Sequence, residues 1–598
     1  MAAKLGFKIF AALLVMVPII TLFMVIGLEK NYVEQLKDEH TAMLARRSAV
    51  HKRSPLGQAQ DQDNANYYRE VSNPKKHIDG LSSNNNDLSH QAQVLYKSGS
   101  PVETVNIQNI ISPGPEFYEM LKERKTYELR MEKSMQESWW YIRSQLEMLK
   151  SGKIPTNNIA PYLTDTLNSM KDQYNSARKW YGELKHSGSP DSTVQLNWQY
   201  WQKNVSMEMQ SLMQKRLDRL QNPKDCDTAR KLVCQVGKTC GFGCQMHHVS
   251  YCFILAFASE RTLVLDSKGW SYSPKGWDSV FLPVSPCQAP GRRRGWSLTS
   301  TELTVSLPPV DNLSPRPPQL PMAVPSDLAD RLMSFHGLPF AWFVSQFLSF
   351  LMRPSADLEQ YIREKKERLA LGSVDGPIVG IHVRRTDKKS EARYHDLREY
   401  MNHVNEWYEW YEMEHNDKEV KRRVFIATDE PSVLKEAKAS YPDYEVHSDA
   451  TITSLASKTS TRYSTDSLFG VIFDVTVLSE CDFLVCTFSS QVCRLAYELM
   501  QQLHVDASRK YYSLDDVYYF GGQQAHNVQA IQDHDSSKQT THDGELSFEA
   551  GDLFGIAGNE KNGYSVGKQV SSQKRGQFPS YKVEEQVRVA DFPTYNDV

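Results

Sequence analysis

The sequence predicts an α/β protein with two open α/β domains, a helical region before them and a small β-barrel after them. Three observations support this fold class. Short apolar runs alternate with amphipathic helical patterns between residues 226 and 535, which is typical of parallel sheets covered by helices. The preceding region repeats apolar residues at intervals of three and four. The final region, residues 540–595, contains short apolar runs separated by glycine, as small barrels do.

The composition allows several domains and excludes recognition driven by overall charge. The chain has 598 residues, and 69 basic against 72 acidic residues leave a formal net charge of -3. At roughly 100–200 residues per domain, this length allows about three or four domains. A nearly neutral chain has no global field that attracts nucleic acid. Binding of a charged ligand therefore depends on local groups.

The first residues indicate a membrane anchor. Lys4 and Lys8 precede an uncharged run at 9–28, which is about as long as the hydrocarbon core of a bilayer is thick. A signal peptide is the alternative, but it has a shorter apolar run followed by small residues. We therefore expect a cytoplasmic tail at 1–8, a transmembrane anchor at 9–28 and a flexible polar stem at 29–112.

A helical region is expected next, at residues 113–222. Apolar residues recur at helical spacing over 116–150 and 159–220, which predicts a helical coiled-coil region. Its apolar stripes favour a homodimer interface, with a plain spacer as the alternative.

Two α/β domains are predicted at residues 223–375 and 376–535, and a proline-rich connector, SPRPPQLPMAVP, lies at 314–325. The candidate strands are 251–257, 262–265, 378–383, 424–427 and 483–486. The candidate helices are 326–335, 358–371, 431–440 and 467–478. Strands that alternate with helices in this way predict parallel sheets.

The cysteines indicate an oxidising compartment. Six of the nine lie between Cys226 and Cys287, which in a membrane-anchored chain favours disulfides and a lumenal or extracellular body. Cys240-Gly-Phe-Gly-Cys244 followed by His247-His248 has the residue types of a zinc site. An oxidising compartment favours a tight disulfide turn instead, and spacing alone does not select the connectivity.

Residues 540–595 resemble a Src-homology-3 domain. The resemblance is carried by the turn Gly551-Asp552 and by Phe578-Pro-Ser-Tyr581. The tryptophans that form the polyproline groove of such domains are replaced by 559–562, Asn-Glu-Lys-Asn, which puts the usual peptide binding in doubt. Pro315-Arg-Pro-Pro318 is either an internal ligand for the barrel or part of a plain linker.

Polar residues follow three of the predicted strands. Arg384-Arg385 follows the strand in GIHVRRTDK, Asp429-Glu430 ends VFIATDE, and Ser489-Ser490-Gln491 ends FLVCTFSSQ. Open α/β sheets bind ligands at the carboxyl ends of their strands. Because guanidinium groups form paired hydrogen bonds with phosphate oxygens, adjacent arginines there suit a diphosphate, such as that of a nucleotide sugar. A solvated surface loop is the alternative for an isolated arginine pair.

Three further polar groups belong to this hypothesis. His382 alternates with Arg384, so both side chains point to one face of the strand end. Asp474 lies in an apolar helix, where a carboxylate is costly unless it is paired, and the adjacent N–H donors of guanine would pair it. A water-facing aspartate is the alternative. Asp533-His-Asp535 has the form of a metal site of sugar transferases, but it lies in the polar segment before the barrel.

Several long motifs together resemble the alpha-1,6-fucosyltransferase family, the Golgi enzymes that add core fucose to N-glycans. They are HVRRTD at 382–387, LVCQVGKTCGFGCQMHHVSYCF at 232–253, PRPPQLPMAVPSDLADRL at 315–332, LVCTFSSQVCR at 484–494 and DDVYYFGGQ at 515–523. The resemblance implies a GT-B-like pair of Rossmann-like domains. It implies that the enzyme transfers L-fucose from GDP-fucose to O6 of the innermost, asparagine-linked N-acetylglucosamine. The implied reaction inverts the configuration and requires no metal or other cofactor. The resemblance also implies a single-pass type II Golgi membrane protein with a lumenal catalytic body, no nucleic-acid partner and a homodimer.

The resemblance implies roles for individual residues. Its donor positions are His382, Arg384, Arg385, Asp474, Ser490, Gln491, Lys238 and Tyr272. Its acceptor positions are Asp387, Lys388, Glu391, Asp429 and Glu430. Glu391 matches the general base toward the O6 hydroxyl, with Lys388 beside it, and Arg384 matches the catalytic group on the leaving diphosphate. The implied disulfides are Cys226–Cys287, Cys234–Cys252, Cys240–Cys244 and Cys486–Cys493, with Cys481 free.

The chain departs from the family pattern at three places. Glu430 replaces the second aspartate of an Asp-Asp pair, Phe242 stands where relatives have tyrosine, and the loop after Lys388 is one residue shorter. The last departure puts the placement of Glu391 in doubt. The alternative functions are another GDP-sugar transferase that acts on protein hydroxyls, or an inactive membrane-anchored glycan-binding or adaptor protein. Intact Glu391, Lys388 and Arg384 favour an enzyme.

Overall fold

The computed structural model describes three stretches of the chain: residues 115–154, 159–186 and 198–595. The third has gaps at 290, 292–293, 298, 310–311, 314, 321, 373–375, 387–391, 416–419, 521–526 and 539–543. The elements below, apart from the first two residues of α7, belong to one compact unit, residues 107–188 and 200–598. The expected tail, anchor and stem at 1–112 lie outside the described residues. None of the described helices has an apolar stretch of the length that crossing a bilayer requires.

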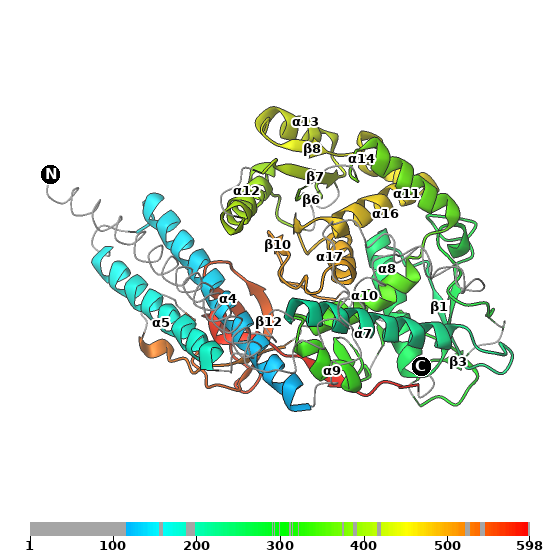
Figure 1. Ribbon diagram of the computed structural model, residues 1–598, viewed down its shortest axis with the longest axis horizontal. Helices are drawn as coiled ribbons and strands as arrows, with labels where there is room; N and C mark the ends of the chain where they lie inside the picture. The colour runs from blue at the N-terminus through cyan, green and yellow to red at the C-terminus, as the bar shows by residue number, and fades with distance from the viewer. Residues whose placement is uncertain are drawn as a thin grey trace, which may run out of the picture. The chain divides into compact units, whose positions relative to one another are not determined.

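Two long helices form the first part of the described chain. α4 (Pro115–Lys150) and α5 (Ile159–His186) lie side by side (Figure 1). The sequence analysis grouped α7 (Trp198–Gln221) with them, but α7 packs on the first α/β domain, where Met209, Met213 and Leu217 are buried. Amphipathic spacing predicts a helix but does not identify the partner of its apolar face.

The first α/β domain contains a parallel sheet of order β2-β1-β4-β3. Its strands are β1 (Lys231–Gln235), β2 (Thr262–Asp266), β3 (Arg294–Gly295) and β4 (Thr304–Ser306). α8 (Phe242–Ala258) connects β1 to β2. The predicted strand at 251–257 is therefore wrong, because these residues belong to α8. This helix is buried along nearly its whole length, and a continuous apolar run does not distinguish a buried helix from a buried strand.

The second α/β domain contains a five-stranded parallel sheet of order β10-β9-β6-β7-β8. Its strands are β6 (Val379–Val383), β7 (Arg423–Thr428), β8 (Glu445–His447), β9 (Phe483–Cys486) and β10 (Tyr511–Ser513). From β6 the chain proceeds outward through β7 and β8, and it then returns to the other side of β6 through β9. The strand order reverses between β6 and β9, which is where sheets of this kind form a ligand crevice.

The remaining helices of the two domains have the following bounds. They are α9 (Ser326–Met333), α10 (Pro339–Leu351), α11 (Ala356–Arg368), α12 (Leu397–Glu414), α13 (Pro431–Ser440), α14 (Ala450–Ser457), α15 (Thr459–Arg462), α16 (Thr465–Glu480) and α17 (Gln491–Leu503). Short 3-10 helices lie at η3 (Trp277–Ser279), η6 (Ser536–Lys538) and η7 (Ser580–Lys582).

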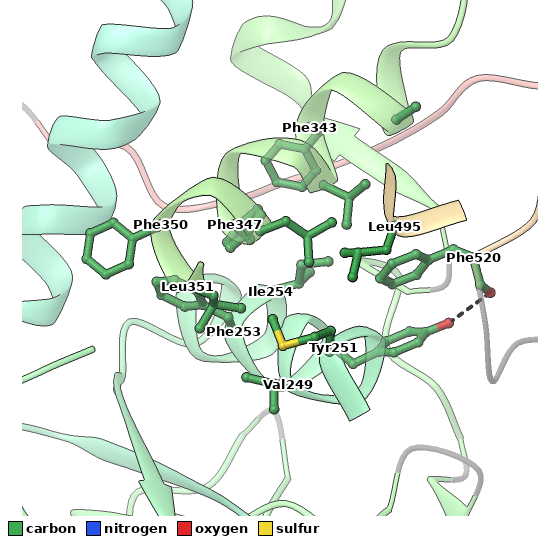
Figure 2. Close-up of a cluster of buried hydrophobic side chains, with 14 of the residues drawn as sticks. Val249, Tyr251, Phe253, Ile254, Phe343, Phe347, Phe350, Leu351, Leu495 and Phe520 are labelled. Atoms are coloured by element: carbon green, nitrogen blue, oxygen red, sulfur yellow. Dashed lines mark hydrogen bonds between the residues drawn. The ribbon is translucent and has the colours of Figure 1, made fainter. Parts of the chain in front are cut away.

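The two domains share a core where α8 and α10 of the first domain meet α17 of the second. Figure 2 shows aromatic and aliphatic side chains of these helices, with Phe253 and Phe347 at a ring-centroid distance of 5.2 Å. The Tyr251 hydroxyl donates a hydrogen bond to the backbone oxygen of Phe520 (3.4 Å). Burial of each large apolar side chain contributes roughly 1.5–3 kcal/mol. The junction is therefore a packed interior.

The C-terminal region is an antiparallel sheet of order β14-β13-β12-β11-β15. Its strands are β11 (Asn527–Ala530), β12 (Leu553–Asn559), β13 (Tyr564–Gln569), β14 (Arg575–Pro579) and β15 (Val583–Glu585). The predicted boundary at 535 to 540 is too late, since β11 already belongs to this sheet. The chain then leaves this antiparallel sheet, and β16 (Arg588–Ala590) pairs in parallel with β5 (Ala323–Pro325).

The antiparallel sheet is joined to α4. The Arg130 guanidinium forms two hydrogen bonds with the Glu584 carboxylate (2.8 and 2.9 Å). Asn559 Nδ2 donates to Glu137 Oε1 (2.7 Å), and Lys561 Nζ contacts the backbone oxygen of Ser513. The segment that replaces the tryptophans of a Src-homology-3 groove thus contacts other parts of the same chain.

Candidate active site

The three predicted strand ends lie at one edge of the second sheet. β6 lies between β7 and β9, and all three strands run in parallel. Their carboxyl ends bring the residues after Val383, Thr428 and Cys486 to the crevice where the strand order reverses. The strand pairing agrees with the convergence that the sequence predicts.

Asp429 organises the turn after β6. Its carboxylate is 3% exposed and accepts hydrogen bonds from Arg384 Nη1 (2.7 Å) and from the backbone N–H groups of Arg385 (2.9 Å) and Thr386 (3.2 Å). The Thr386 hydroxyl also contacts it. The resemblance placed Asp429 among the acceptor positions. In the structure both of its oxygens hold the arginine turn.

The adjacent arginines have different surroundings. Arg385 is buried, donates from Nη2 to the backbone oxygen of His395 (3.2 Å) and places its guanidinium 4.8 Å from the Tyr394 ring centroid. The side chain of Arg384 is 22% exposed. Because successive residues of an extended chain point to opposite sides, Arg384 is the arginine better placed to meet a ligand. Arg385 anchors the turn inside the domain.

His382 is a neutral side chain beneath this turn. Burial, together with the nearby charge of Arg384, lowers its pKa to about 4. Its Nδ1 atom is buried and has no hydrogen-bond partner within the described part of the chain. A buried polar atom of this kind is costly unless a ligand pairs with it. His382 therefore fits a site for a polar group such as a nucleobase.

Tyr272 of the first domain lies beside the arginine turn of the second domain. Its hydroxyl accepts a hydrogen bond from the Phe242 N–H (3.0 Å), and its ring centroid lies 5.1 Å from that of Tyr463. Burial raises the pKa of Tyr272 to about 12, while Arg462 and Arg384 act in the opposite direction. Arg462 Nη2 in turn donates to the Thr386 hydroxyl (3.1 Å). The candidate site is therefore bordered by both domains.

The N-termini of α8 and α17 meet beside the site. Ser490 is the N-cap of α17, and Gln491 is its first residue. A Cβ atom added to Gly243, near the start of α8, would lie only 2.8 Å from the Gln491 carbonyl carbon, so glycine permits the close approach. Gln245 Nε2 donates to the backbone oxygens of Lys238 (2.7 Å) and Cys240 (3.0 Å). The first turns of α8 therefore hold the Lys238 loop near α17.

The disulfides stabilise these loops. The structure contains the four expected pairs, Cys226–Cys287, Cys234–Cys252, Cys240–Cys244 and Cys486–Cys493, and leaves Cys481 free and buried. The 240–244 bridge closes the turn before α8, and the 486–493 bridge encloses the serines before α17. Cys234, His248 and Cys252 lie close enough together for a metal site. Their two sulfurs are joined in the disulfide, however, so they are not thiolate ligands.

Asp474 lies in α16, as predicted. Burial and the nearby charge of Asp449 raise the pKa of its carboxyl well above the ordinary value, and Lys365 opposes them. Glu430, the other acceptor-side carboxylate, is the N-cap of α13 and accepts a hydrogen bond from the Ser432 hydroxyl (2.7 Å). Asp387, Lys388 and Glu391 lie outside the described residues.

The Asp533-His-Asp535 motif belongs to the C-terminal sheet. His534 pairs with Phe548 across that sheet, and its Nε2 lies 2.8 Å from Glu545 Oε1. Asp533 accepts from the Ala550 N–H (2.8 Å), and Asp535 accepts from the Ser537 N–H (3.1 Å). Its placement in a polar segment before the barrel was therefore wrong. These carboxylates hold loops of the sheet.

Sequence reasoning missed several residues of the site. Gln245, Thr386 and Arg462 were assigned no role, and His247 was considered only as part of a zinc site. Thr386 lies inside the quoted HVRRTD motif, so its position was a usable signal. For Arg462 and Gln245 the contacts are made with distant segments, and no local pattern indicates them.

Comparison with known proteins identifies the family. A sequence model described as "Alpha-(1,6)-fucosyltransferase N- and catalytic domains" matches residues 2–519. The chain belongs to the alpha-(1,6)-fucosyltransferase family. The predicted resemblance is thus confirmed, and the protein is an enzyme of this family.

Two relatives agree with this assignment in sequence. The enzyme is 41% identical over 471 residues to an alpha-(1,6)-fucosyltransferase of Drosophila melanogaster, which covers 78% of this chain and 74% of that protein. It is 46% identical over 377 residues to one of Caenorhabditis elegans, covering 62% of this chain and 66% of the relative. A crystal structure of NodZ alpha-1,6-fucosyltransferase soaked with GDP-fucose is 16% identical, with a TM-score of 0.27, and the match covers 45% of this chain and 92% of that one.

Proposed function

We propose that the enzyme transfers L-fucose from GDP-fucose to O6 of the innermost N-acetylglucosamine of N-glycans, in alpha-1,6 linkage. Family membership supports fucose transfer. The observation that carries the donor assignment is Arg384, which Asp429 holds at the carboxyl end of β6. A guanidinium remains charged at all relevant pH values and donates paired hydrogen bonds to phosphate oxygens. There it would stabilise the negative charge that develops on GDP as the bond to fucose breaks.

The donor site is proposed to extend from Arg384 to His382, Asp474, Lys238, Tyr272, Ser490 and Gln491, with Arg385 supporting the turn. His382 is neutral and its buried Nδ1 is open to a base. Asp474 in its ionised form needs hydrogen-bond donors, and the adjacent N–H groups of guanine would supply them. The N-terminus of α17 favours an anionic group, because the N–H groups in the first turn of a helix have no partner within the helix.

The acceptor site is proposed to include the segment that follows the arginine turn. Asp387, Lys388 and Glu391 lie within the five residues that follow Thr386 in the chain, so the turn held by Asp429 leads into this segment. Glu391 is proposed to take the proton of the O6 hydroxyl while that oxygen attacks C1 of fucose from the side opposite GDP, which inverts the configuration. Glu430 completes the proposed acceptor set. No metal is required in this proposal, because cationic side chains act on the diphosphate.

Two further properties belong to the proposal. The apolar run at residues 9–28 and the four disulfides support a type II protein of the Golgi membrane with its catalytic body in the lumen. The exposed apolar side chains of α4 and α5 support a homodimer.

The proposal is tested with the purified protein, GDP-fucose and an asparagine-linked glycan that ends in free N-acetylglucosamine. Mass spectrometry with fragmentation should locate one added fucose on O6 of the innermost N-acetylglucosamine. Fucose found on serine or threonine of a folded protein domain would instead assign the enzyme to protein hydroxyls. Glycan binding without any transfer would indicate an inactive binding protein.

A further inference from the structure

A buried set of polar side chains joins the two α/β domains. His247 of α8 places Nε2 2.8 Å from Glu498 Oε2 of α17, and the Tyr518 hydroxyl donates to Glu498 Oε1 (2.9 Å). On its other side, His247 places Nδ1 2.8 Å from Gln491 Oε1. These four residues, Tyr518, Glu498, His247 and Gln491, form a continuous polar chain that ends at the first residue of α17.

This polar chain lies within an apolar junction. The side chains of His247 and Glu498 are 2% and 0% exposed, and the His247 ring meets the Phe520 ring edge-on at 5.3 Å. Figure 2 shows Phe520 and Leu495 of the same junction. Charged and polar groups in such a place are costly unless each is paired. Glu498 has both carboxylate oxygens paired, so the arrangement specifies one orientation of His247.

The hydrogen bonds also determine the orientation of Gln491. The amide oxygen of Gln491 is an acceptor, and it is the end of the amide that faces His247 Nδ1. With Oε1 held by His247, the amide of Gln491 has its Nε2 group left as the donor end. The close approach of Gly243 to the Gln491 backbone also restrains Gln491.

We propose that His247 is a positioning residue that fixes Gln491 in the donor site, so that the Gln491 Nε2 group donates to an oxygen of the nucleoside diphosphate sugar. Tyr518 and Glu498 fix His247 in turn. The proposal rests on the proposed function, which places Gln491 at the donor. It explains why buried polar side chains lie between α8 and α17, where apolar side chains would pack at lower cost.

A double-mutant cycle tests this role. His247→Asn, Gln491→Ala and the double variant are compared with the unmodified enzyme, through the Kd for GDP by calorimetry and the KM for GDP-fucose. Loss of one hydrogen bond to the donor should weaken binding about tenfold in each single variant. If His247 acts through Gln491, the double variant should bind no more weakly than Gln491→Ala alone. Turnover at saturating GDP-fucose should change less than KM.

His248 provides a matched control. It follows His247 on α8 and is buried, but its Nε2 faces the sulfurs of Cys234 (3.7 Å) and Cys252 (3.9 Å). His248→Asn should therefore leave the KM for GDP-fucose unchanged, even if it lowers the melting temperature. If His247→Asn does not fold, Glu498→Gln serves in its place. The amide keeps the shape of the carboxylate but places an NH2 group against either His247 Nε2 or the Tyr518 hydroxyl.

Three results would overturn the inference. One is a folded His247 variant with an unchanged Kd for GDP, and another is strictly additive effects in the cycle. Failure of the unmodified enzyme to bind GDP would contradict the proposed function itself, and with it the role of Gln491. The comparison therefore separates an error in the positioning role from an error in the donor assignment.

Discussion

The carboxylate of Asp429, at the end of β7, holds the guanidinium of Arg384, at the end of β6, at 2.7 Å. The same carboxylate accepts the N–H groups of Arg385 and Thr386. Arg384 is therefore oriented before any donor binds. Preorganised charge of this kind stabilises a transition state without reorganisation during the reaction.

Replacing Arg384 with lysine should lower turnover by about 10² or more, because the charge remains but the planar pair of donors is lost. The measurement is the fucose-transfer rate at saturating GDP-fucose. Arg393, whose side chain is 78% exposed, supplies the control: Arg393→Lys should leave the rate unchanged. A transfer rate within threefold of the unmodified enzyme would remove Arg384 from the catalytic set.

Glu391→Gln should abolish most fucose transfer while the Kd for GDP stays near that of the unmodified enzyme. The amide keeps the shape of the side chain but does not accept the proton of the O6 hydroxyl. Asp429 is a poor substitute base, since hydrogen-bond donors of the arginine turn already occupy both of its oxygens. Retention of most of the transfer rate would show that Glu391 is not the base.

Chelation of divalent metals should leave the rate nearly unchanged. Cationic side chains are proposed to act on the diphosphate at the place where other sugar transferases use a metal ion. The assay compares transfer before and after dialysis against EDTA, with manganese added back. A loss of activity that manganese restores would contradict the metal-independent proposal.

Glu137 should make stability depend on pH. Burial raises its pKa from the ordinary value of 4.5 to about 7, against the charges of Lys133, Arg509 and Lys561. Because the folded state binds this proton more tightly than the unfolded state, stability should fall as pH rises from about 4.5 to 7, by about 3 kcal/mol in total. Glu137→Gln has no proton to lose and should remove this part of the decline.

The measurement for Glu137 is the free energy of unfolding by denaturant at several pH values between 4.5 and 8. Glu132→Gln is the control, since that side chain on the same helix is 38% exposed and pairs with Arg509 at the surface. Its curve should run parallel to that of the unmodified protein. Parallel curves for Glu137→Gln as well would refute the assignment.

The body without residues 1–112 should be a dimer at micromolar concentration. Trp139, Leu167 and Tyr174 on α4 and α5 are 53%, 47% and 46% exposed, and large apolar side chains gathered on one helical pair favour association. Light scattering should give the mass of two chains, and Trp139→Glu should reduce it to one. Trp410→Glu, at a residue that is 46% exposed on α12, should leave the dimer intact.

Much of the site could be predicted because its signals are local. α13 and β9 occupy the predicted residues. A buried strand followed by charged residues can be recognised from the local sequence alone. Residues 251–257 of α8 were predicted as a strand because almost every residue of that helix is buried, which removes the period that distinguishes the two structures. The disulfide pairs followed from the family resemblance, since spacing leaves many connectivities open.

Other features depend on contacts that no local pattern contains. His247 contacts residues 244 and 251 positions away in the chain, and its neighbour His248 has the same residue type and burial but different partners. β11 joins a sheet whose other strands begin after residue 552, so a short polar strand was assigned to the preceding domain. Tertiary pairing determined both outcomes.

The pairing of β16 with β5 has a consequence for how the chain folds during synthesis. Ser326, which follows β5, donates a hydrogen bond to Asp591 Oδ1 (3.0 Å), a partner 265 residues later in the chain. β5 therefore lacks its partner strand until residues 588–590 have been synthesised and have left the ribosome. Contacts of such long sequence separation form late and slowly. During that interval β5 exposes an unpaired strand edge, which is open to pairing with a wrong strand.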